Sequence, residues 1–148
     1  MRRNRRLLIV GWTLSALALA AAARSPLTLE ELKARASAAK PDDAALANMR
    51  VVQREVEIAD QLYKDGDVEK AQGAVDEAVH YAELSREAAR KSTKHLKQTE
   101  IILREAGRRL GEIRRTLAFD DQPPVQKAED RLETVRRDLL TLMFAPEK

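Results

Sequence analysis

The chain has no cysteine, and its 148 residues include only two tyrosines, two phenylalanines and one tryptophan. Without cysteine, no disulfide can constrain the fold and no thiolate is present to act as a nucleophile. So few aromatic side chains exclude a large core centred on aromatic rings. No segment shows the strict alternation and β-branched richness that predict a strand. We therefore expect an all-α protein whose stability depends on helix packing or on oligomerisation.

Acidic residues are absent before Glu30, and the first 23 residues have the layout of a secretory signal peptide. Four arginines precede an apolar stretch from Leu7 to Leu19, and four alanines then end at Ala23. We expect residues 1–23 to be a signal peptide and the protein to be periplasmic or secreted. The alternative is an uncleaved inner-membrane anchor through residues 7–23, a length at the short end of what spans a bilayer.

The excess of positive charge belongs to this leader. The whole chain has 27 basic and 24 acidic residues, and four of the basic residues are the leader arginines, so 23 basic and 24 acidic residues remain after it. The leader also carries the single tryptophan, Trp12. A near-neutral chain without aromatics in its basic part is a poor candidate for nucleic-acid binding. We expect no nucleic-acid partner, and a membrane contact only if the leader stays attached.

Proline and glycine divide the rest into segments. We expect an N-terminal segment, 24–41, with a short helix from Leu29 to Lys40, because Thr28 and Glu31 have the spacing of a capping box. A helical coiled-coil domain, 42–148, follows, with helices at about 43–64, 67–118 and 124–144. Asp65-Gly66-Asp67 is typical of a turn, and residues 120–124 interrupt the chain again, with Pro124 in the first turn of the last helix.

The segment 67–118 has the strongest periodicity. Alternate steps of three and four residues from Val68 to Leu117 meet no charged residue, which predicts a seam of coiled-coil type. No proline or slip of phase interrupts it, so we predict one continuous helix of about 78 Å. Short turns would fold the two flanking helices back on its two halves, giving a rod of two antiparallel hairpins. The alternative is a break near residues 91–94, which produces a four-helix bundle.

Small residues occupy the middle of this seam, the part that the two flanking helices would reach least. Ala82, Ser85, Ala89 and Ser92 follow one another and bury little apolar area, so we predict the weakest part of the rod here. This region is either a hinge, a place where another helix approaches closely, or a stretch where nothing packs. Gly107 and Gly111 lie beside the seam farther on and predict a close approach of the last helix.

Charge is unevenly distributed along the chain. Residues 42–85 contain 11 acidic and four basic residues, whereas residues 86–118 contain ten basic and four acidic ones. This polarity has three possible explanations. It can complement the helix dipole, the basic half can bind an anionic envelope component, or two rods can pair antiparallel as a homodimer. A thin seam would also leave Tyr81, Ala88 and Ile102 partly uncovered. The candidate interaction residues are Arg86, Arg90, Lys91, Lys94, Lys97, Leu139, Leu140, Met143 and Phe144.

Catalytic and metal-binding patterns are weak. Glu77-x-x-His80 has the spacing of a di-iron ligand pair, but both side chains are expected to face away from the seam. Ser85 and Ser92 lie within the seam and lack the turn that presents a nucleophile. The glycines form no phosphate-binding loop. We therefore expect no catalytic residue, no cofactor and no metal site.

Two resemblances accompany these patterns. Residues 62–67 together with Ala71 and Ala78 resemble the middle of a tetratricopeptide repeat, which implies a helical hairpin and favours protein binding. The stretches 94–101, 108–110 and 122–125 are similar to small exported bacterial helical proteins without an assigned function.

We therefore expect an exported, non-catalytic helical protein that acts as an interaction or structural module of the bacterial envelope. Its partner would be another protein or a second copy of itself. One alternative is a periplasmic chaperone of the holdase type, which grips clients with its hairpins and its apolar tail, residues 139–144. A second alternative is a four-helix bundle that binds a metal or cofactor.

Overall fold

A computed structural model describes residues 26–145. The elements in this part of the chain are α1 (Leu29–Ser37), α2 (Pro41–Lys64), α3 (Val68–Lys91), α4 (Leu96–Thr116), the 3-10 helix η1 (Phe119–Asp121) and α5 (Gln122–Met143). No strand occurs among these residues, so the expected all-α class is confirmed. The predicted signal peptide lies outside the described residues.

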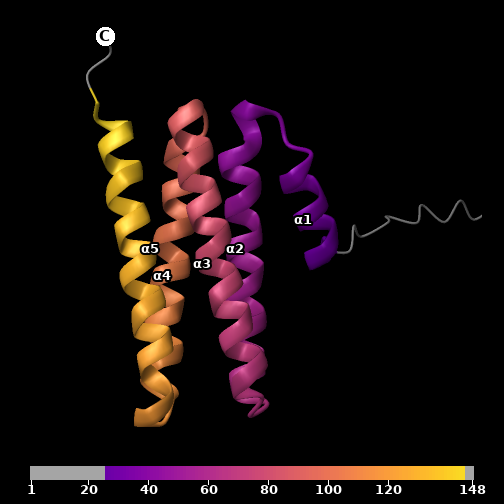
Figure 1. Cartoon of the computed structure of the whole chain (residues 1–148), viewed down its shortest axis with the longest axis vertical. Helices are drawn as coiled ribbons and strands as arrows, with labels where there is room; N and C mark the ends of the chain where they lie inside the picture. Colours follow the sequence, from indigo (N-terminus) through magenta and orange to yellow (C-terminus); the bar gives the residue numbers. More distant parts are fainter. Residues whose placement is uncertain (1–25, 146–148) are drawn as a thin grey trace, which may run out of the picture.

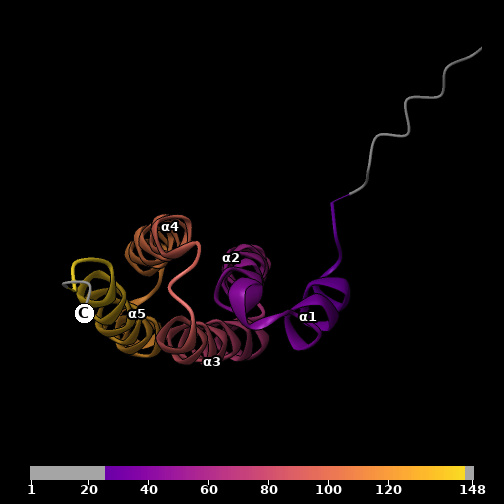
Figure 2. The same ribbon diagram turned by 90° about the horizontal axis from the view of Figure 1, so that it is seen from above.

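The four long helices form a bundle with α1 at its side (Figure 1). Seen from above, α2 and α4 lie in one layer and α3 and α5 in the other (Figure 2). α2 contacts α3 and α4, and α5 contacts the same two helices, so the sequential helices α3 and α4 lie across a diagonal. The chain thus forms two antiparallel hairpins, α2–α3 and α4–α5, which stack side by side.

The predicted continuous helix over 67–118 is wrong. α3 ends at Lys91, Ser92 takes an extended conformation, and His95 has a φ of 63° at the start of α4. The Ser92 hydroxyl donates a hydrogen bond of 2.8 Å to the Asp42 carboxylate at the start of α2. The alternative architecture, a four-helix bundle with a break near residues 91–94, is therefore the observed one.

Burial explains why the helix breaks where no proline or glycine is present. In a rod, each part of the central seam would face one flanking helix, whereas folding the chain back packs each half of the seam against two other helices. The additional apolar burial is worth about 25 cal/mol per Å². A left-handed residue costs about 1–2 kcal/mol, and histidine tolerates this region better than most residues. The free energy gained by burying more apolar surface outweighs the free energy lost where the helix is interrupted.

The core follows the predicted seams. Met49 of α2, Val75 of α3, Leu110 of α4 and Leu139 of α5 are at most 1% exposed. The small-residue region proves to be a place of close approach. Ser85 is fully buried, and its hydroxyl donates a 2.7 Å hydrogen bond to the carbonyl oxygen of Ala45 on α2. The expectation that the flanking helices reach this region least is wrong.

Two local predictions from the sequence are confirmed. Gly66, with a φ of 80°, closes the turn between α2 and α3, and the amides of Gly66 and Asp67 donate to the carbonyls of Tyr63 and Leu62. Thr28 and Glu31 form the expected capping box at the start of α1, although α1 ends at Ser37 and not at Lys40. None of the helices between residues 26 and 145 is both long and apolar enough to span a membrane.

Candidate interaction surfaces

The apolar part of the predicted interaction set lies at the end of α5. Leu139 is completely buried in the bundle core, so its choice as an interaction residue is wrong. Leu140 and Met143 are half-buried, and only Phe144 is highly exposed, at 78%. Most of the apolar tail is therefore buried at least in part, because the last turns of α5 pack against the other helices.

The basic part of that set is divided between paired and free side chains. Arg86 and Arg90 both contact the Asp138 carboxylate of α5, at 3.5 and 3.3 Å. Lys94 lies 3.6 Å from Asp42. Lys91 and Lys97 are exposed and form no ion pair with any residue from 26 to 145. Two of the five predicted cations thus remain available on the surface.

The acidic and basic halves of the sequence meet within one chain. α2 and α4 run parallel, so Asp42 faces Lys94 near one end of the bundle and Asp60 faces Arg109 near the other. His95 lies 3.3 Å from Asp43. The predicted rod with two oppositely charged ends is therefore wrong, because the break after α3 brings the basic α4 beside the acidic α2.

Asp60 is the most enclosed carboxylate in this row, with a side chain 14% exposed. Burial alone would raise its pKa, but hydrogen bonds from Lys64 and Arg109 outweigh burial and hold the pKa below its usual value. The ionised form of Asp60 is therefore favoured in the folded protein.

A surface groove of about 450 Å³ runs between α2 and α4, which contact each other beneath it. Val56, Ile102 and Ala106 provide apolar side chains along it, and the charged residues Glu57, Glu105 and Arg109 line it as well. Ile101 also lines the groove and is 43% exposed, which is high for a large aliphatic side chain. An open apolar trough with charged sides suits a partner segment that has one apolar face.

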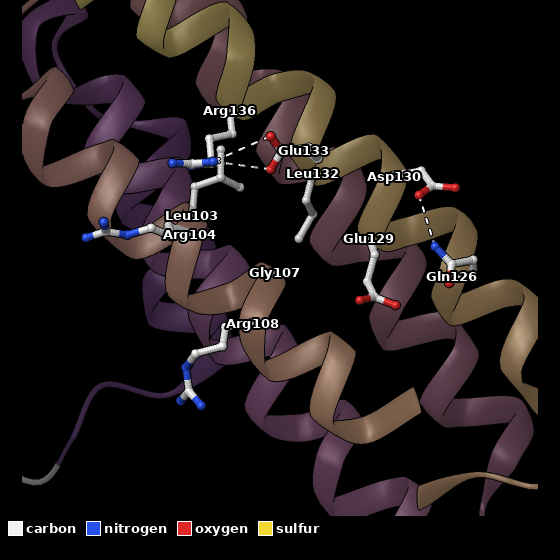
Figure 3. Close-up of a pocket in the computed structure, with 10 residues that line it drawn as sticks. All are labelled: Leu103, Arg104, Gly107, Arg108, Gln126, Glu129, Asp130, Leu132, Glu133 and Arg136. Atoms are coloured by element: carbon white, nitrogen blue, oxygen red, sulfur yellow. Dashed lines mark hydrogen bonds and ion pairs between the residues drawn. The ribbon is translucent and has the colours of Figure 1, made fainter. Parts of the chain in front are cut away.

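The second groove, of about 240 Å³, lies between α4 and α5 (Figure 3). Its hollow includes Gly107, where an added Cβ would meet no atom within 4 Å. Gly111, one turn later, is closely covered, because a Cβ there would lie 2.7 Å from a Glu129 carboxylate oxygen. The predicted close approach of the last helix is thus confirmed at Gly111 and wrong at Gly107.

Charged side chains surround this second groove. Arg136 of α5 contacts Glu133 (Figure 3) and also lies 2.9 Å from Glu100 of α4. Arg108 pairs with Glu105 and Glu112 on its own helix. Leu103 and Leu132 are the large apolar residues of this groove, so it offers less apolar surface than the groove between α2 and α4.

No protein-family model, curated protein or solved structure matches this chain. The resemblances to a tetratricopeptide hairpin and to exported bacterial helical proteins therefore remain interpretations of short motifs.

The candidate metal pair lies on the outside of α3. Both Glu77 and His80 are exposed, as predicted from the seam. Glu77 contacts Lys33 of α1 at 3.0 Å, and the His80 ring packs edge-on against Tyr81. No group of three histidine or carboxylate side chains with metal-binding geometry forms between residues 26 and 145. The pair thus lacks the inward-facing carboxylates that a di-iron site in a bundle requires.

Sequence reasoning identified only part of the groove between α2 and α4. Ile102 was expected to be partly uncovered, and it is half-buried, as are Tyr81 and Ala88. Ile101 was missed, although two adjacent isoleucines on an amphipathic helix indicate an apolar stripe wider than the seam. The parallel pairing of α2 with α4 creates the groove, and nothing in the local sequence specifies that pairing.

Proposed function

We propose that this protein is an exported, non-catalytic helical module that binds another protein in the bacterial envelope. The supporting observation is the groove between α2 and α4, where the exposed Ile101 lies among apolar side chains and charged residues. An amphipathic helix fits such a trough, with its apolar face against Ile101 and Ile102 and its basic residues near Glu57 and Glu105. The basic, apolar and small-residue pattern of residues 1–23 supports export.

The binding function can be tested by site-specific crosslinking in envelope extract. A photoreactive amino acid at position 101 of the full chain is expected to capture one protein species reproducibly. The same probe at position 84 is the matched control, because Leu84 on α3 is 40% exposed and Ile101 on α4 is 43% exposed. Equal labelling patterns from the two positions would contradict a specific site in this groove.

A substitution extends the same test. With the photoreactive amino acid moved to position 53 of the same groove, Ile101→Ser is expected to reduce capture of that partner about tenfold, since removal of an aliphatic anchor from an interface costs more than about 1 kcal/mol. Leu84→Ser should leave capture unchanged. Export is checked separately by mass measurement of the purified protein, where a mature chain beginning at Arg24 is expected and persistence of Met1 would indicate a membrane-anchored form.

A further inference from the structure

Helix α1 packs against α2 and reaches α3 through Lys33, over a surface made of one stripe of each of these two helices. The stripes have helical spacings of three and four residues, so each lies on one side of its helix. We call this the strap surface, and it comprises Asn48, Val51, Glu55, Ala74, Glu77 and Tyr81. Lys33 of α1 reaches across to both helices, with its ammonium nitrogen 3.0 Å from carboxylate oxygens of Glu55 and Glu77.

The strap surface contains a buried carboxylate that shares its neighbouring cation with a second carboxylate. Glu55 is only 3% exposed, and the Lys33 ammonium nitrogen that lies 3.0 Å from its Oε1 is shared with Glu77. Burial raises the pKa of Glu55 above its usual value despite this lysine. A buried carboxylate without complete hydrogen bonding costs free energy. Lys33 of α1 therefore does not fully compensate the buried charge on this surface.

The attachment of α1 is also weak by the standards of the bundle. The helix has nine residues, below the length of about 12–15 at which isolated helices become stable. Only Ala36 of this helix is buried. The bundle core contains no residue of α1, so displacement of α1 leaves that core intact.

The chemistry of the strap surface specifies what binds it best. Two carboxylates and the Tyr81 ring surround one cation, since the Lys33 nitrogen also lies 5.6 Å from the centre of that ring. An arginine fork donates several hydrogen bonds in fixed directions and stacks on aromatic rings. It can therefore donate to Glu55 and Glu77 through separate nitrogens, whereas Lys33 shares one ammonium nitrogen between the two carboxylates.

We propose that the strap surface is a docking site for an amphipathic helix of a partner protein that carries an arginine at the position of Lys33, and that α1 competes for this site within the chain. α1 acts as an internal ligand at high effective concentration. A partner helix displaces it by satisfying Glu55. This surface is separate from the groove between α2 and α4, so either site can fail its test without affecting the other.

The test uses full chains beginning at Arg24 and fluorescently labelled peptides of residues 26–40 as model helices. A chain with Lys33→Gln has a weakened strap, and fluorescence anisotropy measures peptide binding to it. We expect the peptide with Lys33→Arg to bind more tightly than the unaltered peptide, and the peptide with Lys33→Gln to bind at least about tenfold more weakly, as for the loss of a charged hydrogen bond. The unaltered chain should bind every peptide less well than the Lys33→Gln chain does.

Two control chains separate this mechanism from a general loss of structure. Arg35 is also on α1, is exposed, and forms no ion pair with the described residues, so a chain with Arg35→Gln should bind peptides as weakly as the unaltered chain. A chain carrying both Lys33→Gln and Glu55→Gln should lose the preference for the arginine peptide. Unchanged helical circular dichroism confirms that each variant is folded.

Two results would overturn the proposal. One is equal binding of the arginine, lysine and glutamine peptides to the Lys33→Gln chain. The other is a dimer of the unaltered chain that dissociates when excess peptide is added, because it would assign the strap surface to α1 of a second copy and not to a partner protein.

Discussion

Gly107 and Gly111 show how residues of one type in one motif serve different purposes. Glycine in a helix interior costs about 1 kcal/mol relative to alanine. At Gly111 this cost permits the Glu129 carboxylate to pack against α4, while Gly107 faces only the open groove between α4 and α5. The motif spacing predicted a close approach at both positions, but only the tertiary neighbours distinguish them.

The two glycines lead to a paired prediction. Gly107→Ala should raise the free energy of unfolding by about 0.5–1 kcal/mol, because the new methyl group meets no atom and the helix gains propensity. Gly111→Ala should give a smaller gain or none, since the Glu129 carboxylate must move and its contact with Arg114 is disturbed. Urea denaturation of both variants measures the difference. Equal stabilisation by both substitutions would contradict the packing described at Gly111.

Glu55 shows a limit of sequence reading at the same scale. A glutamate on a charged helix is expected to be solvated, yet this side chain is 4% exposed and contacts Lys33 of α1. Nothing in its local sequence distinguishes it from the exposed Glu57 two residues later, and the strap surface could not have been identified without the structure.

At the scale of elements, the parallel pairing of α2 with α4 uses the charge asymmetry of the sequence. Pairing between two molecules is one of the three interpretations of the net charges of residues 42–85 and 86–118, beside the helix dipole and an anionic envelope component. In the folded chain, Asp60 contacts Arg109, and Lys94 and His95 contact Asp42 and Asp43. Exposed pairs each contribute little, but the pattern favours one arrangement of the hairpins over alternatives with like charges adjacent.

Asp60 makes the contribution of this pairing dependent on pH. Its pKa is lowered in the folded protein, so its stabilising effect is present above the unfolded-state pKa of about 3.9 and is lost as the pH falls through the lower folded value. Asp60→Asn should reduce the free energy of unfolding by about 1 kcal/mol at neutral pH. The difference from the unaltered chain should shrink below about pH 4.

The control for this prediction is Asp76→Asn, since Asp76 is exposed and forms no ion pair with residues 26–145. Denaturation curves for this variant should follow those of the unaltered chain across the acidic range. A difference between Asp60→Asn and the unaltered chain that stays constant from neutral pH to pH 3 would show that ionisation of Asp60 is not its source.

For the whole molecule, the connection between α3 and α4 decides between a rod and a bundle. The seam runs through this connection without a change of phase, so the same apolar residues could line one long helix. The extended Ser92, its hydrogen bond to Asp42 and the left-handed His95 maintain the break. Hinges of this kind are where exchange of elements between copies occurs.

Removal of the break should therefore convert the bundle into a longer dimer. The combined change Ser92→Ala, Thr93→Ala and His95→Ala raises helix propensity and removes the hydrogen bond to Asp42. We expect the helix to become continuous, so that each hairpin packs against a hairpin of a second copy and the particle mass doubles relative to the unaltered chain. Size-exclusion chromatography with light scattering measures the mass.

Thr141→Ala supplies the control for that experiment, because it removes another threonine hydroxyl on the exposed face of α5 without touching the connection. It should leave the mass unchanged. A triple variant with the mass and elution of the unaltered chain would show that packing of the four helices maintains the break independently of these three side chains.

The sequence by itself determined the all-α class, the residues of the seams, the turn at Gly66 and the capping box at Thr28, because these features depend on periodicity and on interactions between near neighbours. It also predicts a leader, which stays a prediction. Only the tertiary structure decided that the helix breaks after Lys91, that α2 pairs with α4 and that Glu55 is buried. An apolar seam favours burial without specifying how many helices bury it, and the most complete burial is reached only when the two hairpins stack.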